Sequence, residues 1–141
     1  MSRTRQAGDD PGRVLRLTLT VNALATAATG VLFLAGAPAL HGLFGLTSPA
    51  PLAGAGALFV LFGGYVWIAR RESLYPRLGF SVFMMDVAYV AASVVFLLGF
   101  PRALSPLGWW LVLGLAEVVT VFAIAEYVGL RRLARPAAVH S

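Results

Sequence analysis

The sequence predicts an all-α fold, an integral membrane four-helix bundle with both termini cytoplasmic. The 141 residues are 59% hydrophobic and only 12% charged, and a soluble domain carries about twice that charged share. From Leu17 to Ala69, His41 is the only residue of an acidic or basic type. Apolar runs of this length cross the ~30 Å hydrocarbon core at ~1.5 Å per helical residue. Such runs fill most of the chain, so any chemistry lies within the bilayer or at its surfaces.

The predicted organisation has three parts. A polar tail over 1–13, which contains the turn signal Pro11-Gly12, is predicted to be disordered. A transmembrane bundle over 14–132 follows, and a short cytoplasmic tail covers 133–141. The spans are expected at about 14–36, 52–69, 78–100 and 107–130.

The first span also imitates a secretory signal peptide. A basic tail and an apolar run precede the small residues Ala35-Gly36-Ala37, as at a cleavage site. The apolar run is longer than a typical signal-peptide core, and Pro38 would follow the cut. We therefore interpret it as an uncleaved anchor, with a cleaved signal peptide as the alternative.

One face of this span carries a polar stripe. Its members recur at helical spacing: Thr18, Asn22, Thr26 and Thr29. Hydrogen bonding between helices is one interpretation, because polar side chains hold membrane helices together. The other is a wall of a polar pocket, in which Asn22 and Thr26 would bind a ligand.

The second span is rich in small residues. Ala53, Gly56, Gly63 and Gly64 would let another helix backbone approach closely. In the loop before it, His41 has no second ligand at metal spacing, so we interpret it as a solvated histidine. No metal site or cofactor is expected.

The last two spans carry acids. Asp86 lies near the middle of the run Leu78–Phe100, with Tyr89 and Ser93 on the same helical face. A charge at that depth opposes insertion by roughly 2.5–3.5 kcal/mol, which the apolar residues of the run outweigh. Glu117 lies near the centre of the fourth span and Glu126 near its end.

Helix rise places three of these polar groups at comparable depths. Asn22 and Asp86 lie ~9 and ~12 Å from the cytoplasmic ends of their spans, and Glu117 lies ~15–20 Å in. If the four helices form one bundle, these three groups could converge on one site. Glu126, which points the opposite way from Glu117, is expected to be structural and to pair with Arg131 or Arg70.

The polar interior leaves three functions open. The first is a non-catalytic packing, partner-binding or lipophilic-ligand-binding role, in which Asn22, Thr26 and Tyr89 would contact the ligand. The second is a membrane-embedded acid–base enzyme, an isomerase or cyclase on an isoprenoid or lipid, with Asp86 and Glu117 as catalytic acids. The third is a proton-coupled small-molecule exporter that uses the same acids. A homodimer is compatible with each.

The charges predict location and orientation. Lysine is absent, and ten of the eleven arginines fall in the two tails, the adjoining span ends and the 70–77 connection; only Arg102 falls on the other side. The positive-inside rule then places both termini in the cytoplasm and the chain in the cytoplasmic membrane. Arginines at span ends contact the lipid bilayer, so we expect no nucleic-acid partner. The absence of cysteine excludes disulfides and thiolate metal sites.

Several segments resemble a group of small bacterial four-transmembrane-helix proteins of uncharacterised function, loosely DoxX-like in size and layout. The resembling features are the helix that contains Asn22 and the segments Gly63–Arg71, Asp86–Val90 and Glu126–Arg132. The resemblance implies the four-span topology and no particular activity. Small multidrug exporters also have four short spans, but their key glutamate lies in the first helix, where this chain has Asn22 and threonines.

Overall fold

The computed structural model describes residues 10–71 and 75–135, and within them it is all-helical. Each of its helices is long and apolar enough to cross a membrane. This confirms the predicted helical fold with four membrane-length helices. The helices are α1 (Arg13–Leu40), α2 (Ala50–Ala69), α3 (Tyr75–Gly99) and α4 (Pro106–Ala134).

The helix ends differ from the predicted spans. Helix α1 continues to Leu40 with Pro38 inside it, and α4 continues to Ala134. Both helices therefore extend beyond their predicted ends. A prediction from apolar residues stops where the apolar pattern stops, whereas a helix continues as long as its backbone hydrogen bonds do. Most of the predicted disordered tail (1–9), part of the α2–α3 connection (72–74) and the final residues (136–141) lie outside the described residues.

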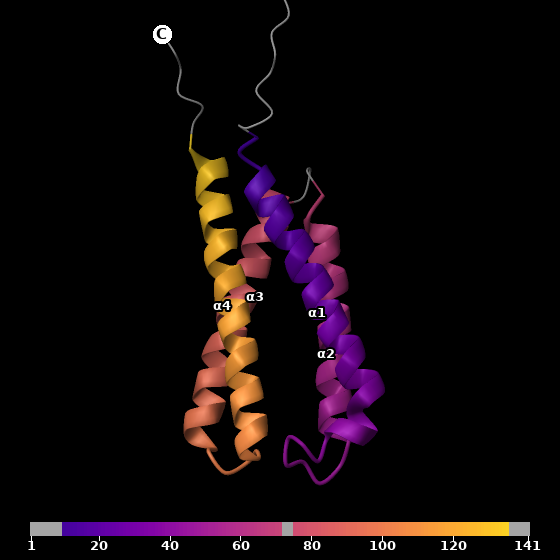
Figure 1. Cartoon of the computed structure of the whole chain (residues 1–141). Coiled ribbons are helices and arrows are strands. Elements are labelled where there is room, and N and C mark those ends of the chain that lie inside the picture. The colour runs from indigo at the N-terminus through magenta and orange to yellow at the C-terminus, as the bar shows by residue number, and fades with distance from the viewer. Residues whose placement is uncertain (1–9, 72–74, 136–141) are drawn as a thin grey trace, which may run out of the picture.

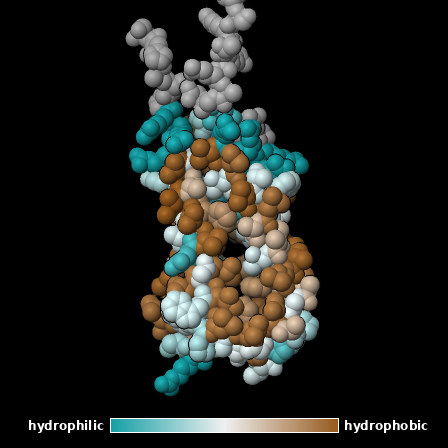
Figure 2. Space-filling model, in the orientation of Figure 1, coloured by the Kyte–Doolittle hydropathy of each residue, from teal (hydrophilic) through white to brown (hydrophobic). Residues whose placement is uncertain are grey.

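The helices form two antiparallel hairpins, α1 with α2 and α3 with α4 (Figure 1). The hairpins meet chiefly through α1 and α4, near the end where α1 begins and α4 finishes, and the helices diverge beyond that contact (Figure 1). At the far end the α1–α2 loop meets the start of α4. Figure 2 shows hydrophilic residues gathered at the end that carries both termini, whereas the sides of the molecule are largely hydrophobic. The surface pattern therefore matches four helices that run lengthwise through an apolar layer.

Helices α1 and α2 pack closely at glycines. A Cβ built on Gly30 would lie 2.6 Å from the Val60 nitrogen, and one built on Gly56 would lie 2.5 Å from the Leu34 nitrogen. Gly63 packs in the same way against Ala27, whereas Gly64 faces open space. Since only glycine permits so close a backbone approach, these positions hold the first hairpin together.

Two separate cores lie at opposite ends of the bundle. The core nearer the termini consists of Leu15, Leu19, Ala23, Val66, Ala69 and Val82. The core at the far end consists of Ala37, Phe44 and Leu52. The hairpins diverge between them, which leaves room for the cavity described below.

Ser105 joins the two loops at the far end. Its backbone N–H donates to the Phe44 carbonyl at 2.9 Å, and its hydroxyl donates to the Leu43 carbonyl. The same hydroxyl oxygen accepts from the Gly108 N–H at 2.9 Å and so caps α4. One side chain thus starts α4 and ties the second hairpin to the α1–α2 loop.

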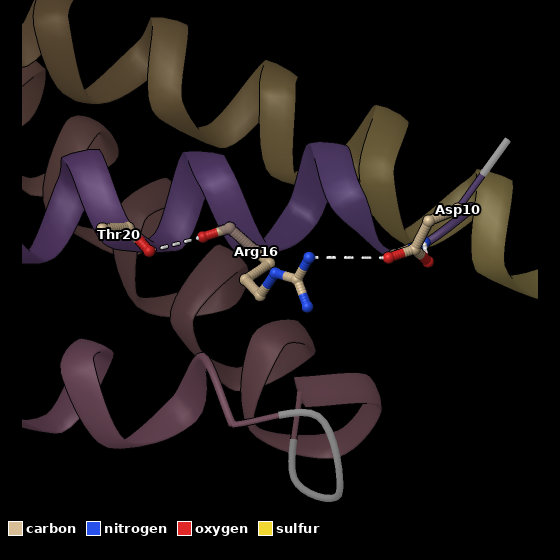
Figure 3. A network of polar contacts seen from close by, with 4 residues as sticks. Asp10, Arg16 and Thr20 are labelled. Carbon is tan, nitrogen blue, oxygen red and sulfur yellow. Dashed lines mark hydrogen bonds and ion pairs between the residues drawn. The ribbon is translucent and has the colours of Figure 1, made fainter. Parts of the chain in front are cut away.

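At the opposite end, Asp10 organises the start of α1 (Figure 3). One of its carboxylate oxygens accepts from the Gly12 N–H at 3.0 Å, and the other lies 3.6 Å from the Arg16 guanidinium. A negative charge at this end complements the helix dipole. The Thr20 hydroxyl donates to the Arg16 carbonyl at 2.8 Å, which keeps that hydroxyl satisfied inside the helix (Figure 3).

Candidate functional site

The side-chain amide of Asn22 joins three helices. Its nitrogen donates to Asp86 Oδ2 on α3 at 2.8 Å and to Glu126 Oε1 on α4 at 2.9 Å. Its oxygen accepts from the Thr26 hydroxyl at 2.9 Å. Because Thr26 can donate only to the amide oxygen, this bond orients the NH₂ group toward the two carboxyls.

The three central side chains are almost completely buried. Asn22 is 1% exposed, Asp86 2% and Glu126 0%. Within the described residues, Glu126 Oε2 has no hydrogen-bond partner. Both carboxyls bond to one nitrogen, so their acceptor oxygens are no farther apart than the sum of the two hydrogen-bond lengths. Two carboxylates that close repel each other in an apolar interior, and a shared proton or a bound cation relieves that repulsion.

Close packing of α1 against α4 assembles this cluster. A Cβ built on Gly129 would lie 2.8 Å from Leu15 Cβ and 2.9 Å from Leu15 Cα. The two helices run antiparallel, so two turns after Leu15 and one turn before Gly129 the chains present Asn22 and Glu126 to each other. Asp86 comes from α3, one turn after the core residue Val82.

A cavity of about 690 Å³ begins at this cluster and extends toward the far end. All four helices contribute to its lining, and Thr26 and Asp86 stand where the polar cluster meets it. Figure 2 shows the molecule hollowed between the two hairpins. The volume lies within the ~300–1,000 Å³ range typical of small-molecule sites.

The polar side chains in the lining come from two helices only. Helix α1 supplies Thr26 and Thr29, and α3 supplies Asp86, Tyr89 and Ser93. The parts of α2 and α4 that line the cavity are apolar throughout. The Tyr89 ring meets Phe59 of α2 edge-on at 5.7 Å between ring centroids, which holds the tyrosine at the cavity wall.

Hydrogen bonds join Asn22 to Thr26 and Asp86, and Thr26, Asp86 and Tyr89 line the cavity, whereas Asn22, also expected to contact a ligand, is not part of that lining. Glu117 is exposed on the outer face of α4, and the carboxyl that joins Asn22 and Asp86 is that of Glu126. Glu117 therefore does not converge with Asn22 and Asp86, a possibility that the sequence left open. The pairing of Glu126 with Arg131 or Arg70 does not occur either, since no ion pair reaches Glu126 within the described residues.

Two signals in the sequence point to Glu126. The inward face of α4 is marked by small residues at helical spacing, Ala116, Ala123 and Gly129, and Glu126 falls on that face. Glu126 also lies five residues before Arg131, ~8 Å along the helix, which is close to the depth of Asn22. A position near the middle of the span did not identify the acid that faces inward, because the rotation of α4 about its axis decides between Glu117 and Glu126.

No group of three or more histidine, cysteine, aspartate or glutamate side chains able to hold a metal ion occurs in the part of the chain that the structure describes. No protein-family model, curated protein or solved structure matches the chain. The function is therefore inferred from the geometry of the cluster and the cavity.

Proposed function

We propose that the chain spans the cytoplasmic membrane four times, with both termini in the cytoplasm, and binds a lipophilic small molecule between its hairpins. The observation that supports this proposal is that polar and apolar side chains line different parts of the cavity wall. Polar side chains of α1 and α3 face apolar side chains of α2 and α4. A mostly apolar cavity with a few convergent polar groups is the usual form of a small-molecule site.

The membrane placement is supported by the distribution of charge. Ten of the eleven arginines belong to the tails, the adjoining helix ends and the α2–α3 connection, and Figure 2 shows the hydrophilic surface gathered at that same end. The positive-inside rule places this end in the cytoplasm. The polar cluster then lies in the cytoplasmic half of the bilayer, and the cavity extends toward the opposite leaflet.

The ligand expected here is an amphipath with a small polar group and an apolar body. Its polar group would contact Asp86, Tyr89 and Ser93, and its body would lie against α2 and α4. The hairpins diverge below the contact between α1 and α4 (Figure 1). A hydrophobic molecule dissolved in the bilayer would reach the cavity between those two helices without passing through water.

Two neighbouring alanines provide the test. Both are exposed, but Ala92 contributes to the cavity lining and Ala91 does not. Ala92→Phe should fill the cavity and reduce the amount of co-purified ligand about tenfold, equivalent to ~1.4 kcal/mol, while Ala91→Phe should leave it unchanged. Native mass spectrometry after mild extraction measures the bound ligand, and chemical extraction identifies it. Equal occupancy in the two variants, or bulk phospholipid alone in the wild type, would refute the proposal.

A second candidate function is favoured by the position of Asp86, which lines the cavity and lies beside a second carboxyl. Such a pair could act as a general acid or base toward a lipophilic substrate, with Glu126 rather than Glu117 as the second acid. Asp86→Asn keeps the side-chain shape but removes the transferable proton. Loss of a deletion-complementation phenotype with ligand occupancy retained would support the enzyme; an unchanged phenotype would exclude both the enzyme and a proton-coupled exporter.

A further inference from the structure

Glu117 stands in the middle of an exposed stripe along α4. Trp110, Val121 and Ile124 on this stripe are 65%, 64% and 60% exposed, and Gly114 and Glu117 are also exposed. The full stripe alternates steps of four and three residues: Trp110, Gly114, Glu117, Val121, Ile124 and Val128. This is the spacing at which two helices pack side by side along a shared seam.

The Glu117 carboxyl is far from both membrane surfaces. Glu117 lies eleven residues after Pro106 and fourteen before Arg131, or ~16 Å and ~21 Å along the helix at 1.5 Å per residue. A glutamate side chain is too short to span either distance, so it cannot reach the headgroups as an arginine at a helix end does. Left against lipid, the carboxyl would have no hydrogen-bond partner.

Residues 10–71 and 75–135 do not supply that partner. Within the described residues, no hydrogen bond or ion pair involves the Glu117 side chain. The cavity-lining residues of α4 nearest to it, Val118 and Val119, lie on other faces of the helix. Exposed side chains of the other helices, such as Leu61 on α2 and Val95 on α3, are apolar and are satisfied by lipid alone. The stripe on α4 differs from these apolar surfaces because it contains a carboxyl, that of Glu117, which requires a hydrogen-bond partner.

We propose that a second copy of this chain covers the stripe, with α4 packed against α4 about a twofold axis near Glu117. In a twofold contact, residues close to the axis lie next to their own counterparts. A protonated carboxyl both donates and accepts a hydrogen bond, so it complements a second carboxyl. Gly114 lies one turn away, and a Cβ there would meet nothing within 4 Å, which leaves room for the second helix. The proposal rests on the membrane placement above but not on the cavity.

Because the chain has no cysteine, single cysteines can map this contact in native membranes. Oxidation should convert Val121→Cys to a disulfide-linked dimer. The matched control is Leu61→Cys on α2, which is 70% exposed and likewise lies well inside its helix, and it should remain monomeric. Equal crosslinking at both positions would show random collision and would overturn the proposal, as would no crosslinking at Val121.

Variants of Glu117 test the role of the carboxyl in the purified chain, reconstituted in lipid and followed by energy transfer between labelled copies. Glu117→Gln keeps a donor and an acceptor and should dimerise like the wild type. Glu117→Leu should weaken dimerisation about tenfold, as expected for the loss of interhelical hydrogen bonds in a membrane. Dimerisation unaffected by Glu117→Leu would overturn the proposal, and so would a monomeric wild type, which would indicate a different protein as the partner. Ala92→Phe should leave dimerisation intact, which separates this test from that of ligand binding.

Discussion

The Asn22 side chain of α1 donates to Glu126 Oε1 of α4 at 2.9 Å, although 104 positions separate the two residues. This bond and the bond from Asn22 to Asp86 link the two hairpins at the end where α1 begins and α4 finishes. The Tyr65 and Ser81 hydroxyls, 2.5 Å apart, add a second polar contact there between α2 and α3. Apolar packing of α1 on α4 and hydrogen bonds between the far loops also join the hairpins. The Asn22 amide therefore both holds the hairpins together and hydrogen-bonds to Asp86 in the cavity wall.

Asn22→Leu should destabilise the protein. It removes the donor to two buried carboxyls and leaves both without that hydrogen bond, at a cost of about 1–3 kcal/mol. Thermal unfolding in detergent measures the change. Thr29→Ala on the same helix is the control, because the Thr29 hydroxyl bonds only to the Ala25 carbonyl of its own helix, and we expect less than ~0.5 kcal/mol there. Similar losses for the two variants would show that the amide does not hold the hairpins.

The two glutamates of α4 should respond differently to removal. Glu126→Ala leaves a gap in the core and deprives Asn22 of an acceptor, so we expect about 1–3 kcal/mol of destabilisation. Glu117→Ala removes an exposed side chain, and the unfolding free energy of the monomer should change by less than ~0.5 kcal/mol. Unfolding at protein concentrations low enough to keep the chain monomeric separates folding from association. A larger loss at Glu117 would mean that α4 is rotated relative to this structure.

Gly129 should not tolerate even one methyl group. Gly129→Ala would place a Cβ within 3.0 Å of three atoms of Leu15, two of them backbone atoms, so the helices must move apart. We expect about 1–3 kcal/mol of destabilisation. Gly64→Ala, whose Cβ would meet nothing within 4 Å, should instead be neutral or slightly stabilising through helix propensity. A neutral Gly129→Ala would place α1 and α4 farther apart than described here.

The proposed topology can be tested with reporter fusions. Fusions after residues 10, 74 and 138 should report the cytoplasm, and fusions after residues 45 and 104 should report the opposite side, because the arginines divide ten to one. Untagged chain localised with antibodies to each tail provides an independent check. A cytoplasmic signal at residue 45 would contradict four spans.

Local patterns account for the parts of the fold that could be predicted. The long apolar runs predict four helices, since only a helix satisfies its own backbone in lipid, and the structure contains four helices of the required length. The glycines of the second span predict close packing, and Gly56 and Gly63 provide it against α1. The stripe on the first span predicts Asn22 and Thr26 as one polar unit, and a hydrogen bond joins them. In each case the signal lies within one helix.

The relation between helices had to come from the tertiary structure. The sequence determined by itself that the chain forms four apolar helices and that one face of the first and one face of the third are polar. It did not determine which acid of the fourth helix faces them, because Glu117 and Glu126 are both compatible with helical periodicity and differ only in rotation about the axis. The approach of Gly129 to Leu15 sets that rotation: it turns Glu126 toward Asn22 and Glu117 outward. The cavity likewise exists only because the hairpins touch at their two ends and diverge between them, a property of packing that no single segment encodes.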